Sequence, residues 1–210
     1  MISKKHMDSS GAPGRIRSGR ILGIDPGSRI VGFGFLVART ERPLSPRDFR
    51  VADAGVLRAP LDLPIHARLG LLHATLFDLI GDLKPDVCVI EKAFCGANAA
   101  TAIKLGEARG ALLAAVSRHD VPVFEITPAE VKRIIAGGGA MRKEAVATAV
   151  EALLEFRRGD LPHDASDAVA IALTHGLNSA TADRLGLTSS TFKSRPKPRS
   201  NRSEQTRSLT

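Results

Sequence analysis

The chain has 210 residues, 43% of them hydrophobic, which suits one domain with its own core. Its apolar runs are only a few residues long and its N-terminus has no signal-peptide pattern, so we expect a cytoplasmic protein and exclude a membrane-spanning one. The formal net charge is +8, but the basic excess lies in residues 1–20 and 178–210. Basic charge alone therefore does not identify the central part as a nucleic-acid-binding domain.

Composition divides the chain into three parts. Residues 1–19 mix Lys, Ser, Gly, Pro and Arg with almost no apolar periodicity, which predicts a flexible basic extension. Periodic apolar segments occupy residues 20–177 and predict one folded domain. From residue 178 onward Ser, Thr, Pro and Arg replace this periodicity, so residues 178–210 are expected to form a flexible basic tail.

The first elements predicted in the folded part are three strands. Residues 20–35 read RILGIDPGSRIVGFGF, an apolar run that breaks at Pro26-Gly27 and resumes as an alternating segment. This pattern predicts a β-hairpin with Asp25 at its bend. Residues 49–57 predict a third strand, which would complete an antiparallel meander.

Helices and strands then alternate. Helical spacing of apolar residues predicts helices over 64–83 and 98–119, and β-rich runs predict strands at 86–90 and 121–126. The second helix is rich in Ala and Gly, which suits either packing on its own sheet or a contact between subunits. Cys88 lies within an apolar run and is expected to be a small core residue.

The last predicted elements are helices. Thr127, Pro128 and Glu130 suit the N-cap, N1 and N3 positions of a helix start. Two further helices are predicted over 142–156 and 162–177. A meander followed by alternating helices and strands indicates an α/β fold with a mixed sheet of about five strands flanked by helices.

Four acids stand out by position. Asp25 and Glu91 each follow an apolar strand, and Asp164 and Asp167 lie one turn apart on one face of a predicted helix. Carboxylates without a His/Cys pattern suit hard cations such as Mg²⁺ or Mn²⁺, and two such ions can catalyse phosphodiester hydrolysis. Taken singly, each acid also fits a plainer role as a turn residue, a solvated strand end, or an N-cap and its neighbour.

Several stretches resemble a known family. The segments ILGIDPGSRIVGFG, VIEKAF, NAATAIKLGEARG and DASDAVAIALTH, in this order and spacing, closely resemble the RuvC family of bacterial Holliday-junction resolvases over about residues 20–177. The resemblance implies a ribonuclease H-like fold and four metal-binding catalytic acids. It also implies three kinds of partner, which are four-way junction DNA, a second copy of the chain, and the branch-migration proteins RuvA and RuvB. By position, these acids are Asp25, Glu91, Asp164 and Asp167.

Phe94 lies in the loop after Glu91, in a chain that has no Trp or Tyr. A Phe is usually a core residue, but a ring in a polar loop beside the acids can stack on unpaired bases. The resemblance assigns Phe94 this stacking role.

A basic cluster surrounds the glycines at 137–139. It consists of Lys132, Arg133, Arg142 and Lys143. These residues suit a phosphate clamp, although two solvated helix faces would show the same pattern. The resemblance points to Lys132 and Lys143 as contacts to DNA or to the transition state. His163 suits a helix-cap neighbour or a proton shuttle, and Arg109 suits a pair with Glu107 or a DNA contact.

Two other classes of function share parts of these patterns. GIDPG also resembles the phosphate hairpin of actin, Hsp70 and sugar kinases, but those folds need two such domains, and 210 residues are too few. Two closer alternatives to a junction nuclease are a related nuclease that acts on RNA and a nuclease-dead relative that acts as a binding module. The presence of all four acids favours an active nuclease, and VIEKAF favours junction DNA through resemblance alone.

Overall fold

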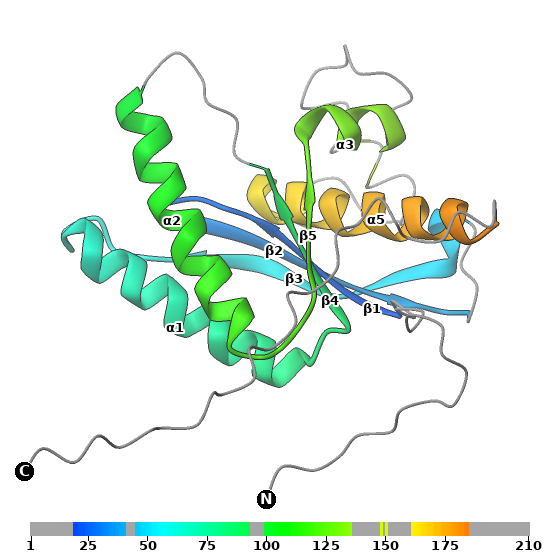
Figure 1. The fold of residues 1–210 in the computed structure, drawn as a ribbon, viewed down its shortest axis with the longest axis horizontal. Coiled ribbons are helices and arrows are strands. Elements are labelled where there is room, and N and C mark those ends of the chain that lie inside the picture. Colours follow the sequence, from blue (N-terminus) through cyan, green and yellow to red (C-terminus); the bar gives the residue numbers. More distant parts are fainter. Residues whose placement is uncertain are drawn as a thin grey trace, which may run out of the picture.

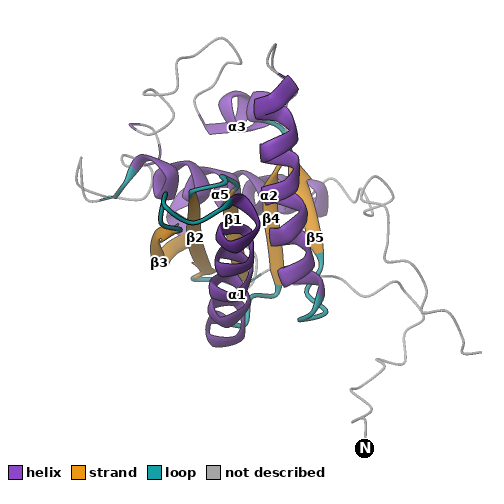
Figure 2. Ribbon diagram, turned by 90° about the vertical axis from the view of Figure 1, so that its left-hand side faces the viewer, coloured by secondary structure: helices purple, strands orange, loops and turns teal. Residues whose placement is uncertain are grey.

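The computed structural model describes residues 19–40, 45–92, 99–135, 148, 150 and 161–184. In these ranges the centre of the molecule is a five-stranded sheet of order β3-β2-β1-β4-β5, seen in this order in Figure 2. The strands are β1 (Arg20–Asp25), β2 (Ile30–Ala38), β3 (Phe49–Arg58), β4 (Val87–Glu91) and β5 (Val123–Ile126). Strands β1, β2 and β3 pair antiparallel, whereas β4 pairs parallel with both β1 and β5. The predicted mixed sheet is confirmed.

Helices cover both faces of the sheet (Figure 1). Helices α1 (Ile65–Leu83) and α2 (Ala99–Ser117) pack on one face, and α3 (Pro128–Ile135) and α5 (His163–Arg184) lie on the other. Helix α5 continues past Leu177, where the apolar periodicity stops, so the predicted end of this helix was too early. The helix predicted over 142–156 lies almost wholly outside the described residues.

The face under α1 and α2 has a core of large side chains. Its largest fully buried members are Leu22, Ile24, Leu72, Leu76, Ile80, Ile90 and Leu112. Cys88 belongs to the same core, as expected, and burial raises the pKa of its thiol to about 12. Close packing of large apolar side chains therefore holds these two helices against the sheet.

The face under α5 is built differently, because small residues meet there. Ala168, Ala170 and Ala172 of α5 are fully buried. A Cβ atom added at Gly23 would overlap the carbonyl oxygen of Ala168, and one added at Gly32 would overlap that of Asp164. These glycines let the backbone of α5 lie directly on β1 and β2.

No helix in the described part of the chain is both long and apolar enough to cross a membrane.

Candidate active site

Two of the predicted acids end neighbouring strands. Ile24 of β1 pairs in parallel register with Ile90 of β4, and Asp25 and Glu91 are the next residues of the two strands. Adjacent strands lie roughly 4.8 Å apart. Val87 and Val89 of β4 belong to the core under α5, so strand alternation places the side chain of Glu91 on that same face. The two carboxylates thus sit side by side beneath α5.

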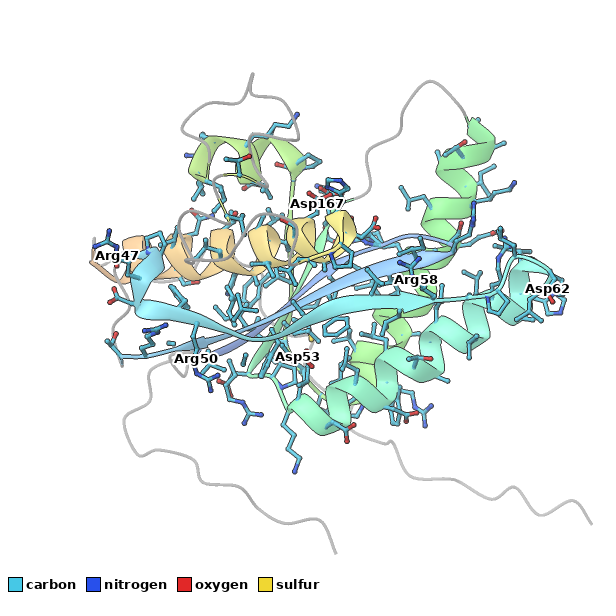
Figure 3. The ribbon with its side chains drawn as sticks, turned by 180° about the vertical axis from the view of Figure 1, so that it is seen from behind. Arg47, Arg50, Asp53, Arg58, Asp62 and Asp167 are labelled. Carbon is cyan, nitrogen blue, oxygen red and sulfur yellow. The ribbon has the colours of Figure 1, made fainter. Side chains whose placement is uncertain are left out.

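Helix α5 carries the other two acids. Asp164 and Asp167 lie in its first two turns and are half-buried, and each is followed directly by a fully buried alanine, Ala165 and Ala168. Figure 3 shows Asp167 toward the N-terminal end of α5. Because Gly32 pairs with Asp25 and touches the backbone at Asp164, the start of α5 lies directly above the end of β1.

One hollow of about 200 Å³ collects most of these groups. It is lined by the charged residues Asp25, Glu91, Lys132 and Asp167 and by Pro128, Val131, Ala170 and Ile171. Asp164 does not line it, although it lies one helical turn before Asp167. The structure therefore brings three of the predicted acidic residues and one predicted basic residue, Lys132, to a single opening. The other residues that line this opening are mostly apolar.

The donor atoms at the hollow suit a hard cation. Its anionic groups are all carboxylates, and oxygen ligands are those that Mg²⁺ and Mn²⁺ prefer. Among the described His, Cys, Asp and Glu residues, however, no group of three or more is arranged to hold a metal ion. The described acids therefore fit such an ion by their chemistry, without forming a closed cage for it.

Arg109 connects Glu91 to the rest of the sheet. Its Nε donates a hydrogen bond to the main-chain oxygen of Glu91 over 3.3 Å, and its guanidinium forms an ion pair with Glu125 of β5. The main-chain N–H of Lys92 also donates to the oxygen of Ile126 over 2.8 Å. Arg109 thus pairs with Glu125 and not with Glu107, which corrects one of the two pairings considered from sequence. The end of β4 is held between α2 and β5.

Helix α3 begins as predicted. Thr127 and Glu130 form a reciprocal cap, in which the N–H of Glu130 donates to Thr127 Oγ1 over 3.2 Å and the N–H of Thr127 donates to Glu130 Oε2 over 2.8 Å. This cap fixes the start of the helix, which carries Lys132 at the hollow. Arg133, the next residue, is exposed. Of these two basic residues of the predicted cluster, therefore, Lys132 lines the hollow and Arg133 faces solvent.

Other predicted residues lie outside the described ranges. They are Phe94, Arg142, Lys143 and the glycines at 137–139. His163 is the first residue of α5 and is exposed, in keeping with a position at the helix start.

Glu125 and the apolar walls of the hollow at Val131 and Ile171 were not predicted from the sequence. Strand alternation was the available signal for Glu125, because Phe124 and Ile126 pack in the core under α5 and Glu125 must face α2.

A mixed five-stranded sheet with acids at the ends of its two central strands, crossed by an acid-bearing helix, is the arrangement of a ribonuclease H-like nuclease. A family model described as "Crossover junction endodeoxyribonuclease RuvC" matches residues 21–175. The chain belongs to this family, which confirms the predicted fold class and the predicted type of enzyme.

Individual relatives agree with the family model. The crossover junction endodeoxyribonuclease of Halorhodospira halophila is 42% identical over 156 residues, 74% of this chain and 89% of the relative. That of Cronobacter sakazakii is 41% identical over 156 residues, 74% of this chain and 85% of the relative. A solved structure of T. thermophilus RuvC in complex with a Holliday junction substrate is 31% identical, with a TM-score of 0.69, and covers 80% of this chain and 96% of that chain.

Proposed function

We propose that this chain resolves Holliday junctions in recombination and repair by nicking two opposed strands, each cut being a phosphodiester hydrolysis. The observation that carries the proposal is the hollow shared by Asp25, Glu91 and Asp167 with Lys132. Acids from distant parts of the chain converge there, in a domain matched by the family over residues 21–175. The solved relative that holds a Holliday junction supports the choice of substrate.

Four acids would hold the divalent ions, Mg²⁺ or in its place Mn²⁺, with two ions at each site. They are Asp25, Glu91, Asp164 and Asp167. When bound, such ions supply an activated water and stabilise the departing oxygen of an in-line displacement. The buried small-residue contact holds the backbone of α5 against the sheet, so the spacing of these proposed ligands would depend on backbone packing.

The remaining predicted residues would bind the DNA. Lys132 lines the acidic hollow, where its positive charge suits the scissile phosphate. Lys143, Arg133 and Arg142 are proposed to contact neighbouring phosphates, and Phe94 to stack on an unpaired base at the branch point. Departure of the 3′-oxygen would leave a 5′-phosphate, so the nicked product could be ligated.

Paired nicks require two active sites, which we assign to a homodimer. Helix α2 supports this assignment, because Ile103 is 63% exposed and Cβ atoms added at Gly106 and Gly110 would meet no atom within 4 Å. A small-residue face of this kind lets another backbone approach closely. Cooperation with RuvA and RuvB, and a cytoplasmic location, follow from the family and are proposed with it.

The experiment compares a synthetic four-way junction with linear duplex of the same sequence, with and without Mg²⁺. We expect cutting of the junction alone and only with Mg²⁺. Asp25→Asn should reduce cutting by about 100-fold or more, because a metal site contributes several kcal/mol to the transition state. Asp53→Asn is the matched control, since Asp53 is an exposed acid on β3 and Figure 3 shows it away from Asp167.

Equal cutting of the two DNAs, or full activity of Asp25→Asn, would contradict the proposal. Junction binding without any cutting at any divalent ion concentration would instead indicate a binding module.

A further inference from the structure

Two arginines lie at the end of the sheet that carries the acids. Strands β1 and β4 finish at Asp25 and Glu91, and at this same end β2 begins and β3 finishes. Arg58 is the last residue of β3 and pairs with Ile30. Arg29 immediately precedes β2, and its main-chain oxygen accepts a hydrogen bond of 2.9 Å from the N–H of Ala59. Both arginines are exposed.

The register places Arg58 on the same face of the sheet as the acids. Gly32 and Gly34 of β2 face α5, because a Cβ added at either would meet its backbone. By alternation Ile30 faces the same way, and residues paired directly across antiparallel strands project to the same side. Arg58, the partner of Ile30, therefore projects on the α5 side, at the open edge of the sheet.

The distance from Asp25 to Arg58 follows from the same register. Asp25 pairs with Gly32, Gly32 pairs with Val56, and Arg58 lies two residues further along β3. Two strand spacings and two residue rises give roughly 12 Å between the Cα atoms of Asp25 and Arg58. At about 3.4 Å of rise per nucleotide in one strand of a duplex, this span covers about three to four nucleotides.

Basic residues from two different elements then accompany the acids. Lys132 belongs to α3, which follows β5, whereas Arg58 ends β3, and β5 and β3 are the two opposite edge strands of the sheet. The guanidinium of Arg58 forms no ion pair with an acid of the described ranges, where the ion pair of Arg109 with Glu125 is the one observed. An exposed guanidinium offers forked donors that match a phosphate group.

Charged residues on an edge strand also serve to prevent pairing with other strands. Arg50 of β3 suits that role, since it is exposed and lies toward the other end of the strand, as Figure 3 shows. Arg58 differs from Arg50 in lying at the end of the sheet that carries the acids. This difference makes Arg50 a matched control within the same strand.

We propose that Arg58, with Arg29 beside it, binds backbone phosphates of the junction arm that leaves the hollow on the β3 side, opposite Lys132. The inference rests on the proposed function and adds the path of the DNA to it. Because the contact is to backbone phosphate, it strengthens the binding of junctions of any DNA sequence to the same degree. It leaves the chemistry at the acids unchanged.

The test measures dissociation constants for a four-way junction in Ca²⁺ over a range of NaCl concentrations. Arg58→Gln should weaken binding by about 10-fold and should lower the slope of log K against log salt by about one, as expected for the loss of one phosphate contact. Adding Arg29→Gln to Arg58→Gln should weaken junction binding further, by a smaller factor. Arg50→Gln should match the wild type, and in Mg²⁺ Arg58→Gln should raise KM and leave kcat unchanged.

An unchanged salt slope for Arg58→Gln, or an equal loss in Arg50→Gln, overturns the inference. Absence of junction binding by the wild-type chain overturns both this inference and the proposed function. Binding without cutting overturns the proposed function alone, because the slope comparison still reports on Arg58. The thermal unfolding midpoints of the variants should equal that of the wild type, and this measurement separates a DNA contact from a loss of folding.

Discussion

The two faces of the sheet hold their helices in different ways. Under α1 and α2 the contact is made by large side chains such as Leu76, Ile80 and Leu112. Under α5 the glycines of β1 and β2 meet the backbone and the alanines of the helix. A layer of long side chains can adjust rotamers, whereas backbone against backbone has no such freedom.

This difference matches what each face carries. The first turns of α5 hold Asp164 and Asp167, which under the proposed function must keep their positions relative to Asp25. Small shifts of reacting groups are costly in catalysis. We expect the face under α1 and α2 to contribute stability above all, and the close contact under α5 to fix the positions of the acids. Three substitutions test this division of roles.

Gly32→Ala should have the largest effect on activity. The added methyl group would overlap the carbonyl oxygen of Asp164, so α5 must move or its first turn must distort. We expect cutting to fall by about 100-fold, since a shift of about 1 Å at a catalytic group can cost this much. The free energy of unfolding should also fall by about 3 kcal/mol, at the upper end of the range for overpacked sites.

Gly70→Ala is the matched control, because a Cβ at this exposed position of α1 would meet nothing within 4 Å. It should leave cutting unchanged and stabilise the protein by up to about 1 kcal/mol through helix propensity. Wild-type cutting by Gly32→Ala would show that α5 tolerates displacement.

Leu76→Ala should separate stability from position on the other face. Leu76 is fully buried in the core under α1 and α2, so its truncation leaves a cavity and should cost about 2–5 kcal/mol of unfolding free energy. At a temperature where the variant is folded, kcat should remain that of the wild type. Denaturant unfolding and single-turnover cutting measure the two quantities. A parallel loss of kcat would mean that this face also positions the acids.

His175 should make the α5 face sensitive to acid. It is 3% exposed, packs on Phe124 with ring centroids 4.7 Å apart, and burial lowers its pKa from 6.5 to about 4. Between these two pKa values the unfolded chain binds a proton that the folded chain does not. Stability should therefore be complete above about pH 6.5 and should fall as the pH decreases, by about 2 kcal/mol between pH 7 and pH 5.

The measurement is the free energy of unfolding across that pH range, for the wild type and for His175→Gln. The variant should be less stable at neutral pH and should lose this part of the pH dependence. An unchanged pH profile in His175→Gln would assign the acid sensitivity to other groups.

Local patterns predicted much of the fold. The alternation of residues 30–37, the break at Pro26-Gly27 and the cap of Thr127 with Glu130 each depend on neighbours in the chain, and each was confirmed. The end of α5 was predicted wrongly because its final turns carry polar residues, so the apolar pattern stops before the helix does. Periodicity reports the buried part of a helix and not its full length.

The candidate site was less accessible to such reasoning. Lys132 and Arg133 are adjacent in sequence and carry equal charges, yet only Lys132 lines the hollow. Strand alternation turns Glu125 toward α2, but the choice between Glu107 and Glu125 as the partner of Arg109 depends on where β5 lies relative to α2. The roles of Phe94, Arg142 and Lys143 remain predictions.

By itself the sequence determined the types of element, since hydrophobic period and turn residues are properties of short segments. The choice of the four acids drew on their positions together with the family resemblance, and their catalytic role stays a prediction. The tertiary structure decided which of those acids line one hollow and which basic residue lines it with them. It also decided how closely α5 approaches β1 and β2. This approach could not be predicted from the sequence, because Gly23 and Gly32 have no side chain and so contribute nothing to a hydrophobic pattern. Their effect appears only in the folded chain, where the backbone of α5 occupies the space that a side chain would fill.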